Sequence, residues 1–205
     1  MALTPAKSTM KERILETADR LFYLQGIRAV GVDTIAAEVG ISKRTLYNHF
    51  PSKDELIAAY LAGRSTPLPP SDKPPIDQIL GSFDRLARNS GRTDFRGCPF
   101  VNAVAELGTE DHAARKIALT FKESRRLWFR GLLQQLGATD ADGVATQLQL
   151  LVDGAIAADL VRNDPAMARA AKAAARVLLT NAGVNVEGAA ADPPPQPIKA
   201  VRKRR

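Results

Sequence analysis

The sequence predicts an all-α fold with two domains and a C-terminal tail. Apolar residues recur every three or four positions along consecutive segments, which is the period of one helix face. Prolines interrupt this pattern at residues 65–75, where they remove backbone donors and favour extended structure. We therefore expect one helical domain over residues 1–62, a second over residues 76–182, and a disordered basic tail over residues 183–205.

The first helix is marked by its N-terminal cap. Thr9 and Glu12 have the spacing of a capping box, in which each side chain bonds the backbone N–H of the other residue. The segment that follows carries one apolar face up to Gly26, formed by Ile14, Ala18, Leu21 and Phe22. We expect this helix to support the next two helices from behind.

Two short helical patterns flank a turn made of Gly40, Ile41 and Ser42. Gly40 suits the end of the first pattern, because glycine enters the left-handed conformation without steric cost. Ser42 suits the start of the second, since its hydroxyl can accept a bond from a free backbone N–H. This layout is typical of a helix-turn-helix, which places its second helix in the major groove of DNA.

The second of these helices, residues 43–50, has two different faces. Leu46 and Phe50 point the same way on a helical wheel, so we expect them to face the core. The opposite side can read base edges and carries Arg44, Thr45 and Asn48. Residues suited to phosphate oxygens lie beside it: Lys43, Tyr47 and His49. Composition alone leaves open the alternative of a solvated helix in an ordinary all-α domain.

A fourth helix begins after Pro51. Ser52 and Glu55 have the spacing of a second capping box. The free N–H groups of this helix, together with Lys53, are expected to form a second phosphate clamp. We predict that the helix runs to about Gly63.

Residues 11–61 resemble the tetracycline-repressor (TetR) family of bacterial transcription regulators, without a gap. The positions that carry the resemblance are Ile14, Ala18, Phe22, Gly26, Thr34, Ile35, Ala36, Gly40, Ser42, Thr45, Leu46, Tyr47, His49, Phe50, Lys53 and Leu56. The resemblance implies a three-helix DNA-binding domain joined to a variable helical domain that binds a small ligand and dimerises. It also implies a phosphate contact by Thr34 and DNA contacts by Lys43, Arg44, Thr45, Tyr47, His49 and Lys53.

Five further helices are expected in the second domain, over residues 76–89, 99–107, 111–136, 140–162 and 165–182. The last two are apolar over more than one face and rich in alanine, which indicates burial on more than one side. We expect them to pack against their symmetry mates as the four-helix bundle of a homodimer, although two core helices of a monomer would look similar.

An effector pocket is expected between residues 76 and 160, where aromatic residues concentrate. The candidate effector-binding residues are Phe83, Cys98, Phe100, Asn102, Glu106, Phe121 and Trp128. Asn102 and Glu106 are four residues apart and so project from one side of a helix. Two alternatives remain: the aromatic residues are simply core, or Cys98 is a redox sensor beside Arg96 and a helix start.

Composition excludes several other classes of protein. The net charge of +7 favours an anionic partner, although residues 1–65 contribute only +2 of it, nine basic against seven acidic residues. One cysteine excludes an internal disulfide, and two histidines with no metal, nucleotide or hydrolase motif argue against an enzyme, a metal or a cofactor. No signal peptide or uncharged membrane-spanning run is evident, so we expect a cytoplasmic protein.

Taken together, these patterns predict a ligand-responsive transcription regulator that binds double-stranded DNA. We expect a repressor that binds a palindromic operator as a dimer and is released by a small, largely apolar effector. The alternative is a DNA-binding regulator of the same fold that acts as an activator or as a cysteine redox sensor, without a small-molecule effector.

Overall fold

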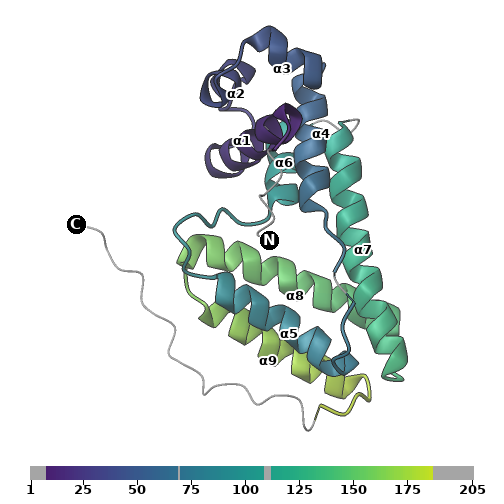
Figure 1. Cartoon of the computed structure of the whole chain (residues 1–205). Coiled ribbons are helices and arrows are strands. Elements are labelled where there is room, and N and C mark those ends of the chain that lie inside the picture. Colours follow the sequence, from purple (N-terminus) through teal and green to yellow (C-terminus); the bar gives the residue numbers. More distant parts are fainter. Residues whose placement is uncertain (1–7, 69, 109–111, 187–205) are drawn as a thin grey trace, which may run out of the picture. The chain divides into compact units, whose positions relative to one another are not determined.

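The computed structural model describes residues 8–68, 70–108 and 112–186, and these ranges contain nine helices and no strand, so the predicted all-α class is confirmed (Figure 1). The helices are α1 (Met10–Gln25), α2 (Val32–Val39), α3 (Lys43–His49), α4 (Lys53–Arg64), α5 (Pro75–Asn89), α6 (Pro99–Leu107), α7 (Ala113–Gln135), α8 (Ala141–Arg162) and α9 (Ala166–Asn181). Most of the predicted tail, residues 187–205, lies outside the described residues.

The helices form two compact units. Unit 1 comprises Met1–Pro67 and Pro99–Leu119, and unit 2 comprises Leu68–Cys98 and Thr120–Arg205. The sequence led us to place residues 99–119 in the second domain, whereas the structure groups them with the N-terminal helices. One contact that joins α6 to the N-terminal helices is long-range: the carboxylate of Glu106 accepts the backbone N–H of Arg28, which follows α1.

Unit 1 is built on the apolar face predicted for α1. Ile14, Ala18 and Phe22 are fully or almost fully buried, and α1 packs against α2 and α4. The Tyr60 ring of α4 meets the edge of the Phe22 ring at a centroid distance of 5.6 Å. Arg64 adds a bidentate ion pair to Asp19, at 2.6 and 2.8 Å, which ties the end of α4 to α1.

Several helices begin at a side-chain cap. The capping box of α1 is present in both directions: Glu12 N–H donates to Thr9 Oγ1 at 3.2 Å, and Thr9 N–H donates to Glu12 Oε2 at 2.7 Å. Hydrogen bonds to the Glu12 carboxyl lower its pKa: the bond from the Thr9 backbone N–H is the larger cause, and the Thr9 side chain is the second. At α8, Asp140 accepts from the Gly143 N–H at 3.0 Å.

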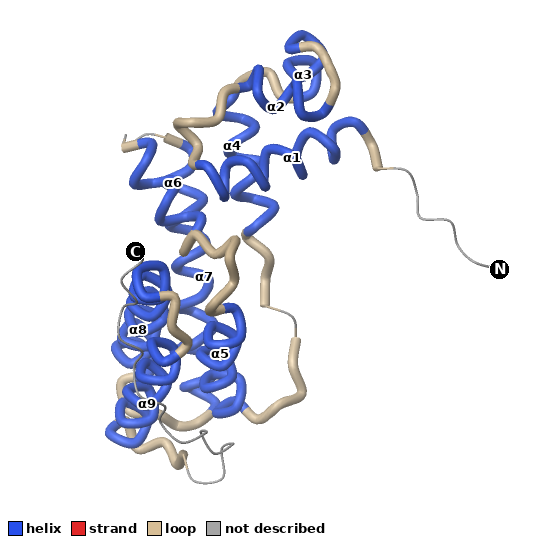
Figure 2. Tube along the Cα trace, turned by 90° about the vertical axis from the view of Figure 1, so that its left-hand side faces the viewer, coloured by secondary structure: helices blue, strands red, loops and turns tan. Residues whose placement is uncertain are grey.

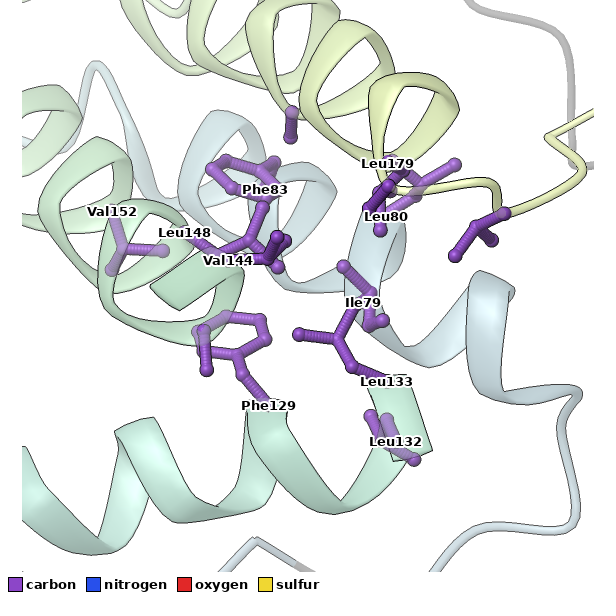
Figure 3. Close-up of a cluster of buried hydrophobic side chains, with 14 of the residues drawn as sticks. Ile79, Leu80, Phe83, Phe129, Leu132, Leu133, Val144, Leu148, Val152 and Leu179 are labelled. Atoms are coloured by element: carbon purple, nitrogen blue, oxygen red, sulfur yellow. The ribbon is translucent and has the colours of Figure 1, made fainter. Parts of the chain in front are cut away.

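Unit 2 surrounds an apolar core supplied by four helices, shown in Figure 3. Ile79, Leu80 and Phe83 come from α5, and Phe129, Leu132 and Leu133 from α7; α8 and α9 add Val144, Leu148, Val152 and Leu179. Helix α9 packs against both α5 and α8, and the three lie side by side in Figures 1 and 2. The predicted apolar faces therefore meet in one core.

Helix α8 is apolar on its outer side as well. It is the one helix in the described ranges with the length and hydropathy of a membrane span. However, it carries three carboxylates that would be costly in hydrocarbon, and two of them lie mid-helix or beyond and are engaged inside unit 2. Asp153 pairs with Lys122, and Asp159 accepts a hydrogen bond from Ser90 at 2.5 Å. We therefore interpret α8 as a packing helix with an apolar outer face.

Candidate nucleic-acid interface

The turn between α2 and α3 has the geometry that its sequence predicts. Gly40 lies in the left-handed region, with φ 78° and ψ 38°. Its N–H donates to the Ala37 carbonyl at 3.1 Å, and the Ile41 N–H donates to the Ala36 carbonyl at 2.9 Å. These two bonds close the end of α2 in a Schellman motif. Ser42 then caps α3 by accepting from the Thr45 N–H at 3.1 Å.

Helix α3 turns its apolar side inward and its polar side to solvent. Leu46 and Phe50 are buried in unit 1, as predicted. Arg44 and Asn48 are exposed, and Tyr47 retains 37% of its surface. Thr45 and His49 are partly exposed, and Thr34 on α2 is exposed. The side chains proposed to read base edges are therefore available on one surface of the helix, from which they could enter a major groove.

Lys43 is exposed but paired in the free protein. Its Nζ lies 3.0 Å from Asp33 Oδ2, and both side chains are more than half exposed to solvent. The hydrogen bond and the charge of Asp33 raise the pKa of the Lys43 ammonium. An exposed pair of this kind contributes little stability, so a phosphate oxygen can replace the carboxylate at small cost.

Lys53 has an internal partner that the sequence did not indicate. Its Nζ donates to the Ile27 carbonyl at 2.6 Å, and it lies 5.9 Å from the centre of the Phe22 ring. Partial burial lowers the pKa of this ammonium. The side chain expected in a phosphate clamp thus holds the segment after α1 in the free protein. Ser52 caps α4 by accepting from the Glu55 N–H at 3.1 Å, which is one of the two bonds of the predicted capping box.

The position of Glu106 in unit 1 was not predicted from the sequence. Its Oε2 accepts the Arg28 N–H at 2.8 Å, so α6 and α4 bind the backbone of neighbouring residues, Arg28 and Ile27. A methyl group at Gly26 would lie 3.1 Å from the same carboxylate oxygen. In the free protein the Glu106 carboxylate therefore binds the segment that precedes α2, and its role in an effector pocket stays a prediction.

Comparison with known proteins decides the family. The model of bacterial regulatory proteins of the tetR family matches residues 14–60, which span the helix-turn-helix. A TetR transcriptional regulator from Streptomyces avermitilis shares 34% sequence identity, covers 87% of this chain and all of its own, and superposes with a TM-score of 0.79. This chain belongs to the TetR family.

Further relatives of this TetR-family chain agree. SCO4454 of Streptomyces coelicolor, a TetR-family regulator, is 32% identical over 84% of this chain and 95% of its own, with a TM-score of 0.74. The HTH-type regulator YxaF of Bacillus subtilis is 26% identical over 78% of this chain and 89% of its own. These relatives are regulators of transcription rather than enzymes, and the chain is likewise a DNA-binding transcriptional regulator.

The residues predicted to bind an effector divide between the two units of this TetR-family protein. Phe100 is buried in unit 1, and Asn102 and Glu106 lie on the same helix. In unit 2, Phe83 belongs to the apolar core, while Cys98, Phe121 and Trp128 are partly buried. The spacing of Asn102 and Glu106 is helical as expected, but the carboxylate binds protein backbone.

Trp128 is the predicted effector residue that lines a described cavity. The cavity lies in unit 2, has a volume of about 680 Å³, and is bounded by α5, α7, α9 and the segment before α5. The Trp128 ring packs against the Phe129 ring with a centroid distance of 4.9 Å. Since Phe129 belongs to the core, this contact holds the Trp128 ring in place at the cavity wall.

Proposed function

We propose that this TetR-family regulator is a repressor that binds a palindromic operator as a homodimer and leaves it when a small molecule binds. The observation that carries the proposal is the exposed polar surface of α3, backed by buried Leu46 and Phe50. One helix of this length contacts too few bases for useful specificity. Two copies related by a two-fold axis would read half-sites about 34 Å apart, or a multiple of that distance.

The proposed dimer rests on the outer faces of α8 and α9. Leu150, Gly154, Ala157 and Val161 recur at helical spacing on the side of α8 opposite the core, and all four are exposed. The exposed side of α9 is likewise apolar, with Ala170, Ala173, Ala174 and Val177. Small side chains let helices approach closely, and apolar surface of this extent on adjacent helices favours a partner of the same kind.

Repression is supported by a relative. The transcriptional repressor SCO4008 of Streptomyces coelicolor is 37% identical over 118 residues, which cover 53% of this chain and 61% of that protein. Release by a small molecule is supported by the cavity beside Trp128, where such a molecule could bind. A ligand that binds preferentially to a conformer unable to hold the operator shifts the population away from the DNA-bound conformer.

The proposal is tested by selecting bound sites from random duplex DNA with the purified full-length chain. An enriched inverted repeat, bound by two protomers in a footprint, would support a dimeric operator complex. Enrichment of a single half-site, or no enrichment over competitor DNA at moderate ionic strength, would contradict it. A reporter gene placed behind the selected site then separates repression from activation, since a repressor lowers its expression.

A further inference from the structure

The cavity of unit 2 is more basic than an apolar effector requires. Four basic side chains and two acidic ones line it: Lys73, Arg85, Arg88, Lys172, Asp77 and Asp84. Lys172 is nearly buried, and its Nζ binds both oxygens of Asp84, at 2.9 and 3.1 Å. This pair uses one cation and one carboxylate of the wall, which leaves Lys73, Arg85 and Arg88 at the cavity with Asp77 as their acidic neighbour.

The excess charge is concentrated on one helix face. Arg85 and Arg88 are three residues apart on α5, so their side chains leave the same side of the helix. The pKa of the Arg85 guanidinium is lowered, first by partial burial and then by Arg88. The pKa of Arg125 on α7 is lowered in the same way, by burial and then by Arg85. These cations repel one another, and a bound anion would relieve that repulsion.

The same cavity also has apolar lining residues. Trp128 lines it, with its ring held against Phe129, and Leu68 and Leu80 contribute aliphatic surface. Guanidinium groups bind a carboxylate through two parallel hydrogen bonds, while an indole ring stacks on a flat apolar body. A volume of about 680 Å³ lies in the range of small-molecule sites.

We propose that this cavity binds an organic anion that joins a flat ring to a carboxylate, with Arg85 and Arg88 on the carboxylate and Trp128 on the ring. The inference rests on the proposed effector response and names its chemical class. It also modifies the expectation of a largely apolar effector, because the ring remains apolar while one end carries the charge.

Binding is tested with 4-nitrocinnamate and its neutral isostere 4-nitrocinnamamide, by calorimetry on the full-length chain. We expect the carboxylate to bind at least about tenfold more tightly than the amide, and to lose that advantage in the Arg85→Gln/Arg88→Gln double variant. Arg162→Gln, an exposed arginine of α8 outside the cavity, is the matched control. Equal affinity of the two probes, an equal loss in the control, or no carboxylate binding at millimolar concentration would overturn the proposal.

Substitutions at two glycines test the location of the site without changing its charge. Gly81 lines the cavity within α5, and Gly131 lies within α7 outside it; a Cβ at either position meets nothing within 4 Å. Gly81→Leu should therefore fill the cavity and abolish carboxylate binding, whereas Gly131→Leu should leave it unchanged. Quenching of Trp128, the single tryptophan of the chain, reports the same binding. Undiminished quenching in Gly81→Leu would overturn the assignment.

The two proposals fail in different ways. If the random-site selection yields no operator, the proposed function falls, while the affinities of the two probes still test the cavity. If an operator is found but the carboxylate binds no better than the amide, only the anion site falls. Support for both requires that 4-nitrocinnamate releases the operator complex of the native chain and leaves that of the Arg85→Gln/Arg88→Gln variant intact.

Discussion

In the free protein, the basic side chains in and near α3 differ in their hydrogen-bond partners. Arg44 is exposed, Lys43 is held by Asp33, and Lys53 is held by the Ile27 carbonyl. An exposed guanidinium is available for two hydrogen bonds to guanine, whereas an ammonium that must leave a partner is better suited to phosphate contacts. Base reading and positioning should therefore separate experimentally by residue.

Arg44→Ala should relax the preference for one or two base pairs, at a cost of about 1–3 kcal/mol on the preferred operator and little on other sequences. Tyr47→Ala should instead weaken binding to every sequence by a similar factor, since a phosphate contact carries no base information. Affinities on a panel of single-base operator variants check both. An equal loss on every sequence for Arg44→Ala would contradict its base-reading role.

Lys43→Gln should lower affinity on all sequences and reduce the slope of log affinity against log salt by about 1. The pair with Asp33 is exposed, so its loss should leave the fold intact. Fluorescence anisotropy of a labelled operator at several salt concentrations measures the slope. A slope equal to that of the native protein would exclude a phosphate contact by Lys43.

Glu106→Ala should lower the free energy of unfolding by about 1 kcal/mol, because the Arg28 N–H loses its acceptor. Glu106→Gln should retain most of the stability, since an amide oxygen can accept the same bond. Urea unfolding compares these variants with Glu16→Ala, an exposed glutamate of α1, as the control. If Glu106→Ala unfolds like the control, the bond to Arg28 does not support unit 1.

Among the helices, α8 is distinguished by apolar surface on two opposite sides. Its inner side contributes Leu148 and Val152 to the core, while Leu150 and Val161 keep 65% and 84% of their surface exposed. Such side chains gain by burial against another molecule, at about 25 cal/mol for each Å² removed from water. The outer side is therefore where a substitution should change assembly without changing the fold.

Leu150→Arg combined with Ala157→Arg should convert the proposed dimer to a monomer with unchanged helix content, because four charges would meet at one interface. Light scattering after size exclusion should then give 22.1 kDa in place of twice that mass. Leu119→Arg is the control, since Leu119 is 70% exposed on α7 rather than on α8 or α9. If the double variant stays dimeric, the dimer interface does not lie on the outer side of α8.

For the molecule as a whole, acid stability depends on surface carboxylates held by arginine. Arg126 on α7 binds Glu123 at 2.6 Å and Asp142 of α8 at 2.7 Å. Its hydrogen bonds lower the pKa of both carboxyl groups. The unfolded chain therefore binds protons that the folded chain does not, so this contribution is present above the ordinary carboxyl pKa and is lost as pH falls through the lowered values.

Arg126→Gln should make the thermal midpoint fall less steeply between about pH 5 and pH 3, because the two carboxyl groups return towards ordinary titration. The difference from the native protein should be largest at neutral pH, where the whole contribution is present, and should vanish below the lowered pKa values. Its size should be modest, since the pairs are exposed and screened. Arg162→Gln again serves as the control. Parallel pH profiles for the native chain and Arg126→Gln would show that the cluster does not contribute.

Helix boundaries and the face that each helix buries could be predicted from the chain. Thr9 and Ser42 act as caps as expected, and Leu46 and Phe50 are buried as their spacing indicated. These features depend on residues within one or two turns, where steric preference and periodicity leave a visible pattern. The surface of α3 was predictable for the same reason.

Contacts between distant parts of the chain were not predictable. Glu106 bonds to Arg28, which is 78 residues away in the sequence, and Lys53 bonds to Ile27, which is 26 residues away. No periodicity or motif spacing in the sequence indicates either contact. The basic lining of the cavity arises likewise, because α5, α7, α9 and the segment before α5 bring single side chains together. Local pattern thus decided the helices and the exposed surface of α3 that is proposed to read DNA, which need only neighbouring residues. Packing decided the cavity and the role of Glu106, since a bond over such separations exists only once the helices have met.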